Sequence, residues 1–171
     1  VPLVWIPHPV DGIARQAIAG DLNMLLEDGF RTVFVFADLI AAGIDTEFAA
    51  FDPTSLLFLR HIRQVELCSD VETIVTVRRE PIDSHTRSVT LANSNGITKW
   101  TLVDEGDINL AFIEDDKGIA KLDERQAVVH AFLPTLESTG FPFKINGDIS
   151  TDPSRTRVIL DDRTAAGLRS I

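Results

Sequence analysis

Between Gln64 and Val103, apolar and polar residues alternate with a period of two, and this constrains the fold more than any other feature of the sequence. The alternation is clearest over Val75–Arg78 and Ser88–Leu91. A period of two places alternate side chains on opposite faces of a strand. Asn95-Gly96 follows as a strong turn signal, because a type I′ turn needs positive φ at both central positions. The region therefore predicts an antiparallel meander with a hairpin at this pair.

The remaining elements are predicted from apolar spacing and from capping residues. Asp52-Pro53 is typical of a helix start, because Asp accepts a hydrogen bond from a free N–H and Pro has no N–H to lose. Pro134 and Gly140 predict a loop between two late strands. We expect helices over 11–28, 53–63, 153–160 and 164–168, and strands over 32–36, 108–113, 128–132 and 141–145.

These elements predict an α+β (mixed α/β) chain with a substantial antiparallel sheet and packed helices. A length of 171 residues fits one domain or one and a half. Acidic and turn residues cluster between Asp104 and Glu124, which places a soft boundary there. We therefore expect residues 1–104 to form one part and residues 105–171 the start of another.

Charge and cysteine content restrict the class of protein. The sequence has 26 acidic and 16 basic side chains, for a formal net charge of −10, which disfavours a nucleic-acid partner. The apolar run Val33–Ile44 is interrupted by Asp38 and is too short to span a membrane. Val1–Val10 does not read as a signal peptide. A single cysteine, Cys68, rules out an internal disulfide, and together these features favour a cytoplasmic protein without a membrane partner.

Metal and hydrolase chemistry have weak sequence support. The four histidines are scattered, without the paired spacing of a zinc site, so we expect no metal site and ordinary surface or half-buried histidines. Glu114–Asp116 lacks the alternating oxygen ligands of a calcium loop and is typical of a solvated turn. A hydrolase is the least favoured of three functional hypotheses, and it would require a cleft that unites a histidine with a nucleophile. The other two hypotheses, given below, depend on a family resemblance and on interaction surfaces. The histidines are His8, His61, His85 and His130.

A possible anion site lies late in the chain. Ser154 and Arg155 follow Asp152-Pro153 at the start of the helix predicted over 153–160. A helix N-terminus offers free N–H groups to an anion, and an arginine adds a planar fork suited to phosphate oxygens. The alternative, which the residues alone favour, is that Arg155 and Arg157 form surface ion pairs with nearby acids. Those acids are Asp148, Asp152, Asp161 and Asp162.

The same stretch carries a family resemblance. Val128–Thr135, Thr139–Asp148 and Ser154-Arg155 together resemble sacsin and its bacterial relatives, in which similar strands and an arginine follow a Bergerat-fold ATPase domain. Upstream, Leu56–Ile62 looks like a leucine-rich helix of these proteins, and Gly29–Val33 looks like the strand that closes their nucleotide domain. The block from Phe132 to Asp148 is the most specific part of the match.

The resemblance implies a fragment of an ATPase of the gyrase, ninety-kilodalton heat-shock chaperone, histidine kinase and MutL (GHKL) group. Residues 1–104 would be the C-terminal part of the nucleotide domain, and residues 105–171 the start of a middle, transducer-like domain. Arg155 would be the catalytic contact to the γ-phosphate, with Thr32 and Ser154 beside the nucleotide. The chain departs from the related chaperones at Thr156, where they carry Glu, and it separates Arg155 from Arg157, where sacsin tends to a paired arginine.

The resemblance also implies that this stretch is insufficient for ATP chemistry. The catalytic glutamate, the metal-binding asparagine and the glycine-rich turns of the family are not matched between Val1 and Ile171. ATP and Mg²⁺ are therefore expected only in the full-length parent, where ATP hydrolysis would occur. We expect a relay between the nucleotide domain of the same chain and the rest of the protein, with protein clients as further partners. The alternative is a non-catalytic protein–protein interaction module.

Overall fold

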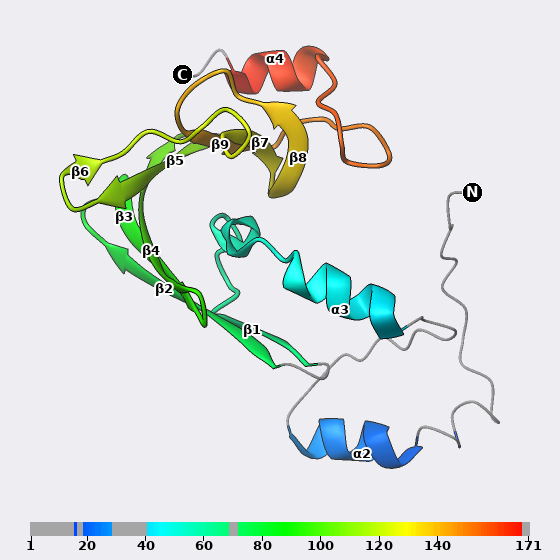
Figure 1. The fold of residues 1–171 in the computed structure, drawn as a ribbon. Helices are drawn as coiled ribbons and strands as arrows, with labels where there is room; N and C mark the ends of the chain where they lie inside the picture. Colours follow the sequence, from blue (N-terminus) through cyan, green and yellow to red (C-terminus); the bar gives the residue numbers. More distant parts are fainter. Residues whose placement is uncertain (1–15, 17–18, 29–40, 69–71, 169–171) are drawn as a thin grey trace. The chain divides into compact units, whose positions relative to one another are not determined.

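The computed structural model describes residues 16, 19–28, 41–68 and 72–168. The chain divides into two compact units, Val1–Ile40 and Ala41–Ile171. In the first unit, helix α2 spans Ala19–Glu27 and matches the end of the helix predicted over 11–28. The strand predicted over 32–36, which includes Thr32, lies outside the described residues. Figure 1 shows the second unit, in which a large sheet dominates.

The sheet has nine strands in the order β1-β2-β3-β4-β5-β9-β7-β8, with β6 beside β5. Neighbouring strands are antiparallel, except for the parallel pair β7 and β9. The predicted antiparallel meander is confirmed, as is the strand expected at 108–113. The strands are β1 Gln64–Leu67, β2 Thr73–Pro81, β3 Thr86–Asn93, β4 Gly96–Glu105, β5 Ile108–Asp115, β6 Gly118–Ile119, β7 Val128–Ala131, β8 Leu133–Ser138 and β9 Lys144–Gly147.

The boundary expected near residue 104 falls between two paired strands. β4 and β5 pair from Lys99↔Glu114 to Glu105↔Ile108, so residues on both sides of the boundary belong to one sheet. Helices are few in the described part of the second unit. They are α3 Ala41–Ala49, the short 3₁₀ helix η1 Pro53–Leu56 and α4 Asp162–Leu168. The chain is therefore rich in strands. None of the helices in the described ranges is long and apolar enough to cross a membrane.

The β3–β4 hairpin forms where it was predicted, but its turn is shifted by one residue. Asn93 pairs with Gly96, so Ser94 and Asn95 form the two-residue connection. Gly96 has a φ of 138°, whereas Ser94 and Asn95 keep negative φ. The predicted type I′ turn centred on Asn95-Gly96 is therefore wrong, because Gly96 takes part in the ladder instead of occupying the turn.

The helix predicted over 53–63 is reduced to η1. Its start is confirmed, since Oδ1 of Asp52 accepts a hydrogen bond of 2.9 Å from the Thr54 N–H. Beyond Leu56 the chain makes successive tight turns, and Arg79 of β2 donates to the carbonyls of Leu56, Leu59 and Ile62. The Leu59 N–H donates to the Leu56 carbonyl at 3.2 Å and the Ile62 N–H donates to the Leu59 carbonyl at 3.1 Å, so backbone bonds here span three residues and not the four of an α-helix. The prediction of a helix that continues to residue 63 is therefore wrong, and Arg79 bridges the turns that replace it.

The core lies between this turning segment, 56–62, and one face of the sheet. Leu56, Leu57 and Phe58 are consecutive and all buried, which a helix with one apolar face could not achieve. Trp100 is 1% exposed. The cluster is completed by Val75, Val77, Val89, Leu91, Leu102, Ala111, Leu122 and Ala127. The inward positions of the meander are therefore the ones that the alternation of the sequence predicted.

The late strands differ in their limits from those expected. β7 and β8 meet at a sharp corner, where Ala131 pairs with Leu133 and Phe132 has a φ of 66°. Pro134 was expected in a loop but lies in β8, where it pairs with His130. β8 ends the sheet order, and an edge strand tolerates proline because it has one free side. The strand predicted over 141–145 is shifted to Lys144–Gly147.

The helix predicted over 153–160 does not form. Asp152 and Arg157 are joined by a backbone hydrogen bond of 3.0 Å, and Thr151 bridges Val158 in antiparallel fashion. The Asp152 carboxylate accepts hydrogen bonds from the N–H groups of Thr156 and Arg157 and from the Ser154 hydroxyl. The side chain therefore closes a loop and does not cap a helix. The last helix, expected over 164–168, is confirmed as α4.

Candidate functional site

A cleft of about 610 Å³ lies where four segments of the second unit converge. The segment 58–62 forms one wall, the β4–β5 turn and the start of β5 form a second, and the β7–β8 corner and the end of β9 complete it. Its lining combines apolar rings with amides and charged groups. The lining residues are Phe58, Leu59, Arg60, His61, Ile62, Gly106, Asp107, Asn109, Phe132, Asn146, Gly147 and Asp148.

Asn146 of β9 holds the strained corner of the cleft. Its side chain is 2% exposed, and its Oδ1 accepts a hydrogen bond of 2.8 Å from the Phe132 N–H. A positive φ is costly for a bulky residue such as Phe132 and persists only where the surroundings enforce it. Asn146 therefore fixes the corner and places Phe132, whose side chain is 50% exposed, at the cleft.

A row of polar side chains crosses the sheet from this corner. Asp104, Asn109, Asn146 and His130 are directly opposite one another on β4, β5, β9 and β7. Nδ2 of Asn146 donates to Oδ1 of Asn109 at 3.1 Å, and Nδ2 of Asn109 donates to Oδ1 of Asp104 at 2.7 Å. Asp104 also pairs with Arg87 of β3. Hydrogen-bonded side chains thus connect the neighbouring strands β3, β4, β5 and β9 on one face of the sheet.

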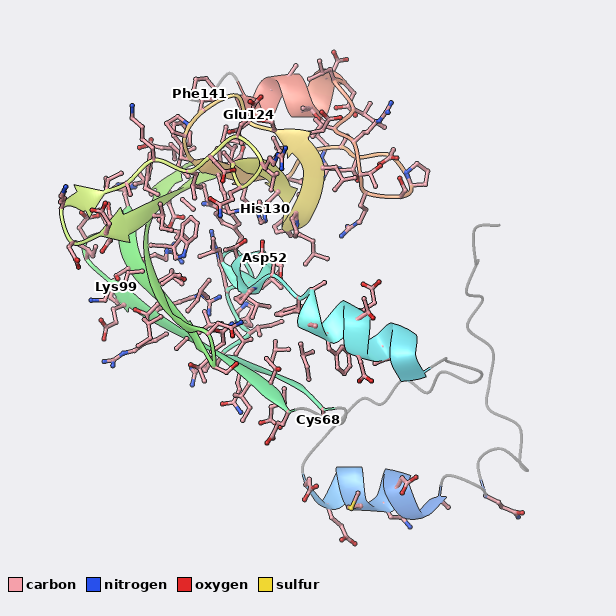
Figure 2. The ribbon with its side chains drawn as sticks, viewed as in Figure 1. Asp52, Cys68, Lys99, Glu124, His130 and Phe141 are labelled. Carbon is pink, nitrogen blue, oxygen red and sulfur yellow. The ribbon has the colours of Figure 1, made fainter. Side chains whose placement is uncertain are left out.

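His130 ends this row in a fully buried position. The imidazole of His130 contacts the Phe58 ring edge-on, with 4.9 Å between the ring centroids. Figure 2 labels His130 on the β7–β8 strand pair and Asp52 just before η1. Neither Nδ1 nor Nε2 has a hydrogen-bond partner in the described part of the chain. Burial, with a smaller contribution from Lys144, lowers the pKa of His130 to about 3. The ring is therefore neutral at physiological pH.

Lys144 is the second buried ionisable group near the row. It is 2% exposed, and its Nζ donates to the carbonyl of Gln126 at 2.6 Å. Burial lowers the pKa of Lys144, and the Asp52 carboxylate partly opposes that shift. Buried lysines of this kind are rare because an ammonium group loses its hydration on burial.

Two of the three residues predicted to contact nucleotide lie in the described part of the chain, next to each other in an exposed loop. Thr32 lies outside the described residues, and neither Ser154 nor Arg155 lines the cleft. Both are exposed in the loop closed by Asp152, and Arg155 has a φ of 58°. Hydrogen bonds lower the pKa of Asp152 to about 2, with the largest contribution from the Ser154 hydroxyl and the next from the Arg157 N–H. The argument from a helix N-terminus is therefore wrong here, because a carboxylate already takes up the N–H groups.

The surface ion pairs suggested as the alternative do not form among the described residues. Asp148 pairs with Arg163 of α4 instead of Arg155 or Arg157. Within the described ranges, no ion pair involves the side chain of Arg155 or Arg157. The role that the resemblance gives to Arg155 stays a prediction.

The sequence reasoning did not single out the residues that form the polar row, the corner and the buried ionisable groups, which are Asn109, Phe132, Asn146, His130 and Lys144. The last four lie in the two motif blocks that carry the resemblance, but they were treated only as parts of a pattern. Polar residues at inward positions of strands were the available signal. His130 and Lys144 occupy such positions in otherwise apolar runs, and the expectation of surface or half-buried histidines is wrong for His130.

One group of side chains could offer ligands to a metal ion. Glu66, Cys68 and Glu72, at the β1–β2 connection, bring a carboxylate oxygen, a thiol sulfur and a second carboxylate oxygen within 4.8 Å of one another. All three residues are exposed. Acidic groups often cluster on exposed surfaces without binding an ion, so this group by itself does not define a metal centre.

The cleft carries charged groups of both signs beside apolar ones. Arg60 and His61 come from the segment 58–62, Asp107 comes from the β4–β5 turn, and Asp148 follows β9. His61 lines the cleft, whereas His130 does not, and the His130 ring nitrogens have no hydrogen-bond partner among the described residues. Comparison of the chain with protein-family models, with curated proteins and with solved structures finds no match in any of the three.

Proposed function

We propose that this chain is the relay region of a sacsin-like, chaperone-type ATP-binding protein of the cytoplasm. In this proposal, residues 1–104 end a Bergerat-type nucleotide domain and residues 105–171 begin a middle domain, within an α+β architecture. One observation carries the proposal. The block with the most specific resemblance, Phe132–Asp148, supplies Phe132, Asn146, Gly147 and Asp148 to the cleft. Four residues of this block therefore line one cleft, which supports a shared role for them.

The polar row offers a physical route for the relay. Asn146 ties the strained corner at Phe132 to Asn109, and the row continues to Asp104 and Arg87. A contact that moves the corner would disturb hydrogen bonds on four neighbouring strands. Nucleotide binding elsewhere in the protein could then shift the population between two arrangements of this sheet.

ATP and Mg²⁺ belong, in this proposal, to the complete parent protein and not to this stretch alone. Arg155 would reach the γ-phosphate from its exposed loop, with Ser154 beside it. Thr32 would lie near the nucleotide on the strand expected over 32–36. The partners would be the nucleotide domain of the same chain and protein clients, with no nucleic acid and no membrane. An exposed Arg155 without an ion-pair partner in the described part of the chain supports a contact made with another domain.

The test is ATP turnover of the full-length parent with Arg155→Ala, and Arg157→Ala is the matched control because both side chains are exposed. We expect a large fall in turnover for Arg155→Ala, with ATP affinity and circular dichroism retained, and little change for Arg157→Ala. Unchanged turnover in Arg155→Ala would contradict the relay proposal. ATP titrated calorimetrically into the 171-residue chain should give no binding isotherm, and a clear isotherm would show that the chain binds ATP by itself.

The edge strand β8 favours a second candidate, a non-catalytic protein–protein interaction module. Leu133 and Leu136 of β8 are 41% and 79% exposed, which is unusual for leucines in a strand. The Leu136 N–H already donates to the Thr156 carbonyl at 2.9 Å, so side chains rather than the open edge would contact a partner. In this case Leu136→Ser should weaken a partner complex, while Arg155→Ala should leave it unchanged.

A further inference from the structure

The sequence contains two Asn-Gly pairs, and the fold places them in opposite environments. Asn95-Gly96 lies at the tip of the β3–β4 hairpin, where both residues are exposed. Asn146-Gly147 forms the end of β9, where both residues are buried. The two pairs share the same chemistry, so a difference in their reactivity would report the difference in their surroundings.

An exposed Asn-Gly pair can rearrange in water without an enzyme. The main-chain nitrogen of the glycine loses its proton to base, attacks Cγ of the asparagine and closes a five-membered imide. The bond from Cγ to Nδ2 breaks, and Nδ2 takes up a proton and leaves as ammonia. Water then opens the imide, at the side-chain carbonyl to give aspartate or at the main-chain carbonyl to give isoaspartate. Glycine favours ring closure because it has no Cβ to obstruct it.

The hairpin tip leaves this reaction open at Asn95. The Asn95 N–H donates to Oδ1 of Asn93 at 2.9 Å, whereas the Asn95 side chain makes no hydrogen bond to the described residues. A Cβ added to Gly96 would meet no atom within 4 Å, so the space around the pair is open. Asn93↔Gly96 is the last pair of the β3–β4 ladder, and the end of a ladder opens at low cost in free energy. Such opening frees the Gly96 nitrogen for the attack.

The same reaction is blocked at Asn146 by the sheet. Oδ1 of Asn146 accepts from the Phe132 N–H at 2.8 Å, and Nδ2 donates to Asn109 at 3.1 Å, so both ends of the amide are held. A Cβ added to Gly147 would lie 2.5 Å from Cδ1 of Ile108, which shows how little free space surrounds this pair. β9 lies between β5 and β7, so it has no free edge. Ring closure at Asn146 therefore requires the sheet to open first.

We propose that Asn95 is a covalent modification site, at which the folded chain converts asparagine to aspartate and isoaspartate, and that the fold protects Asn146 from the same reaction. Each conversion adds one negative charge at the hairpin tip. Isoaspartate also carries the main chain through its Cβ, which inserts one additional backbone atom between β3 and β4. The proposal does not depend on the relay function proposed above.

The experiment is incubation of the 171-residue chain in mildly alkaline buffer, folded or unfolded in guanidinium chloride, followed by tryptic peptide mapping with mass spectrometry. Trypsin cuts after Lys and Arg, so the two pairs fall in separate peptides, Ser88–Lys99 and Ile145–Arg155. In the folded chain we expect Asn95 to convert at least about tenfold faster than Asn146, because the reaction at Asn146 depends on the small population of the opened sheet. In the unfolded chain the two rates should become similar.

Two controls accompany this comparison. Asn93 lies in the same peptide but precedes Ser94 and not a glycine, so it should keep its amide. Asn95→Gln should abolish the acidic species seen by isoelectric focusing, because the longer side chain would have to close a six-membered ring, and its circular dichroism spectrum should match the wild type. Incubation continues until the unfolded sample has converted. An intact Asn95 in the folded chain at that time, or equal conversion of Asn95 and Asn146 in the folded chain, would overturn the proposal.

Discussion

Replacement of His130 by phenylalanine should remove part of the acid sensitivity of this chain. The pKa of His130 is lowered from 6.5 to about 3 in the folded chain, chiefly by burial. Below pH 6.5 the unfolded chain therefore binds a proton that the folded chain excludes. The stability that the neutral ring provides is complete above pH 6.5 and is lost as the pH falls toward 3.

The magnitude follows from these two values. At pH 5, an unfolded-state pKa of 6.5 and a folded-state pKa of about 3 give a loss of about 2 kcal/mol relative to pH 8. The free energy of unfolding should be measured at pH 8 and pH 5 by urea titration, with the fluorescence of buried Trp100 as the probe. His130→Phe should lose about 2 kcal/mol less than the wild type between these pH values.

The comparison between variants isolates the histidine. Acidic groups such as Asp152 also respond to acid, but they are present in both proteins and cancel in the difference. His61→Phe is the control, because His61 is exposed and should keep the wild-type difference. If His130→Phe lost as much stability as the wild type between pH 8 and pH 5, the imidazole would be solvated in the folded chain and the reasoning would be refuted. At pH 8, His130→Phe should change the free energy of unfolding little, because removal of two unpaired ring nitrogens stabilises the folded chain and the larger phenyl ring destabilises it.

Three further predictions test the cleft and its surroundings. Asn146→Ala should lower the free energy of unfolding by about 2–3 kcal/mol in urea titrations, because the Phe132 N–H and the row lose their partner. Gly147→Ala should cost about 1–3 kcal/mol, since its Cβ would lie 2.5 Å from Cδ1 of buried Ile108, and Ile108→Val should restore part of that loss in the double variant. Burial lowers the pKa of Lys144 in the folded chain below the 10.5 of the unfolded chain, so wild-type stability should rise with pH between these two values and reach its full gain above pH 10.5. Lys144→Met should abolish this rise, and an unaltered alkaline stability profile would contradict the prediction.

Local patterns in the sequence were sufficient for the meander and for individual caps. The alternation at Val75–Arg78 and Ser88–Leu91 placed the inward side chains correctly, because a strand exposes one face to the core and the other to solvent. Asp52 was recognised as a cap, because its side chain bonds to an N–H only two residues away. Such interactions are contained within a few residues, so the sequence reveals them without knowledge of the fold.

Two predicted helices failed, for different reasons. The helix expected over 53–63 stops at Leu56, and the turns that replace it are bridged by Arg79, more than twenty residues after Leu56, so the local pattern could not reveal this contact. The helix expected over 153–160 is replaced by a loop through a local interaction, because the Asp152 side chain bonds to the N–H groups of Thr156 and Arg157 instead of capping a helix.

The cleft itself was decided only by tertiary structure. Asp104, Asn109, Asn146 and His130 form one row because β9 enters the sheet between β5 and β7, a strand order that no local pattern specifies. Pairing of strands far apart in the chain depends on how all inward side chains pack together, and so does the burial of His130. The sequence by itself determined the strands of the meander and the cap at Asp52, because these depend on neighbouring residues, whereas the tertiary structure determined the limits of the late strands, which polar side chains meet and which lose contact with water.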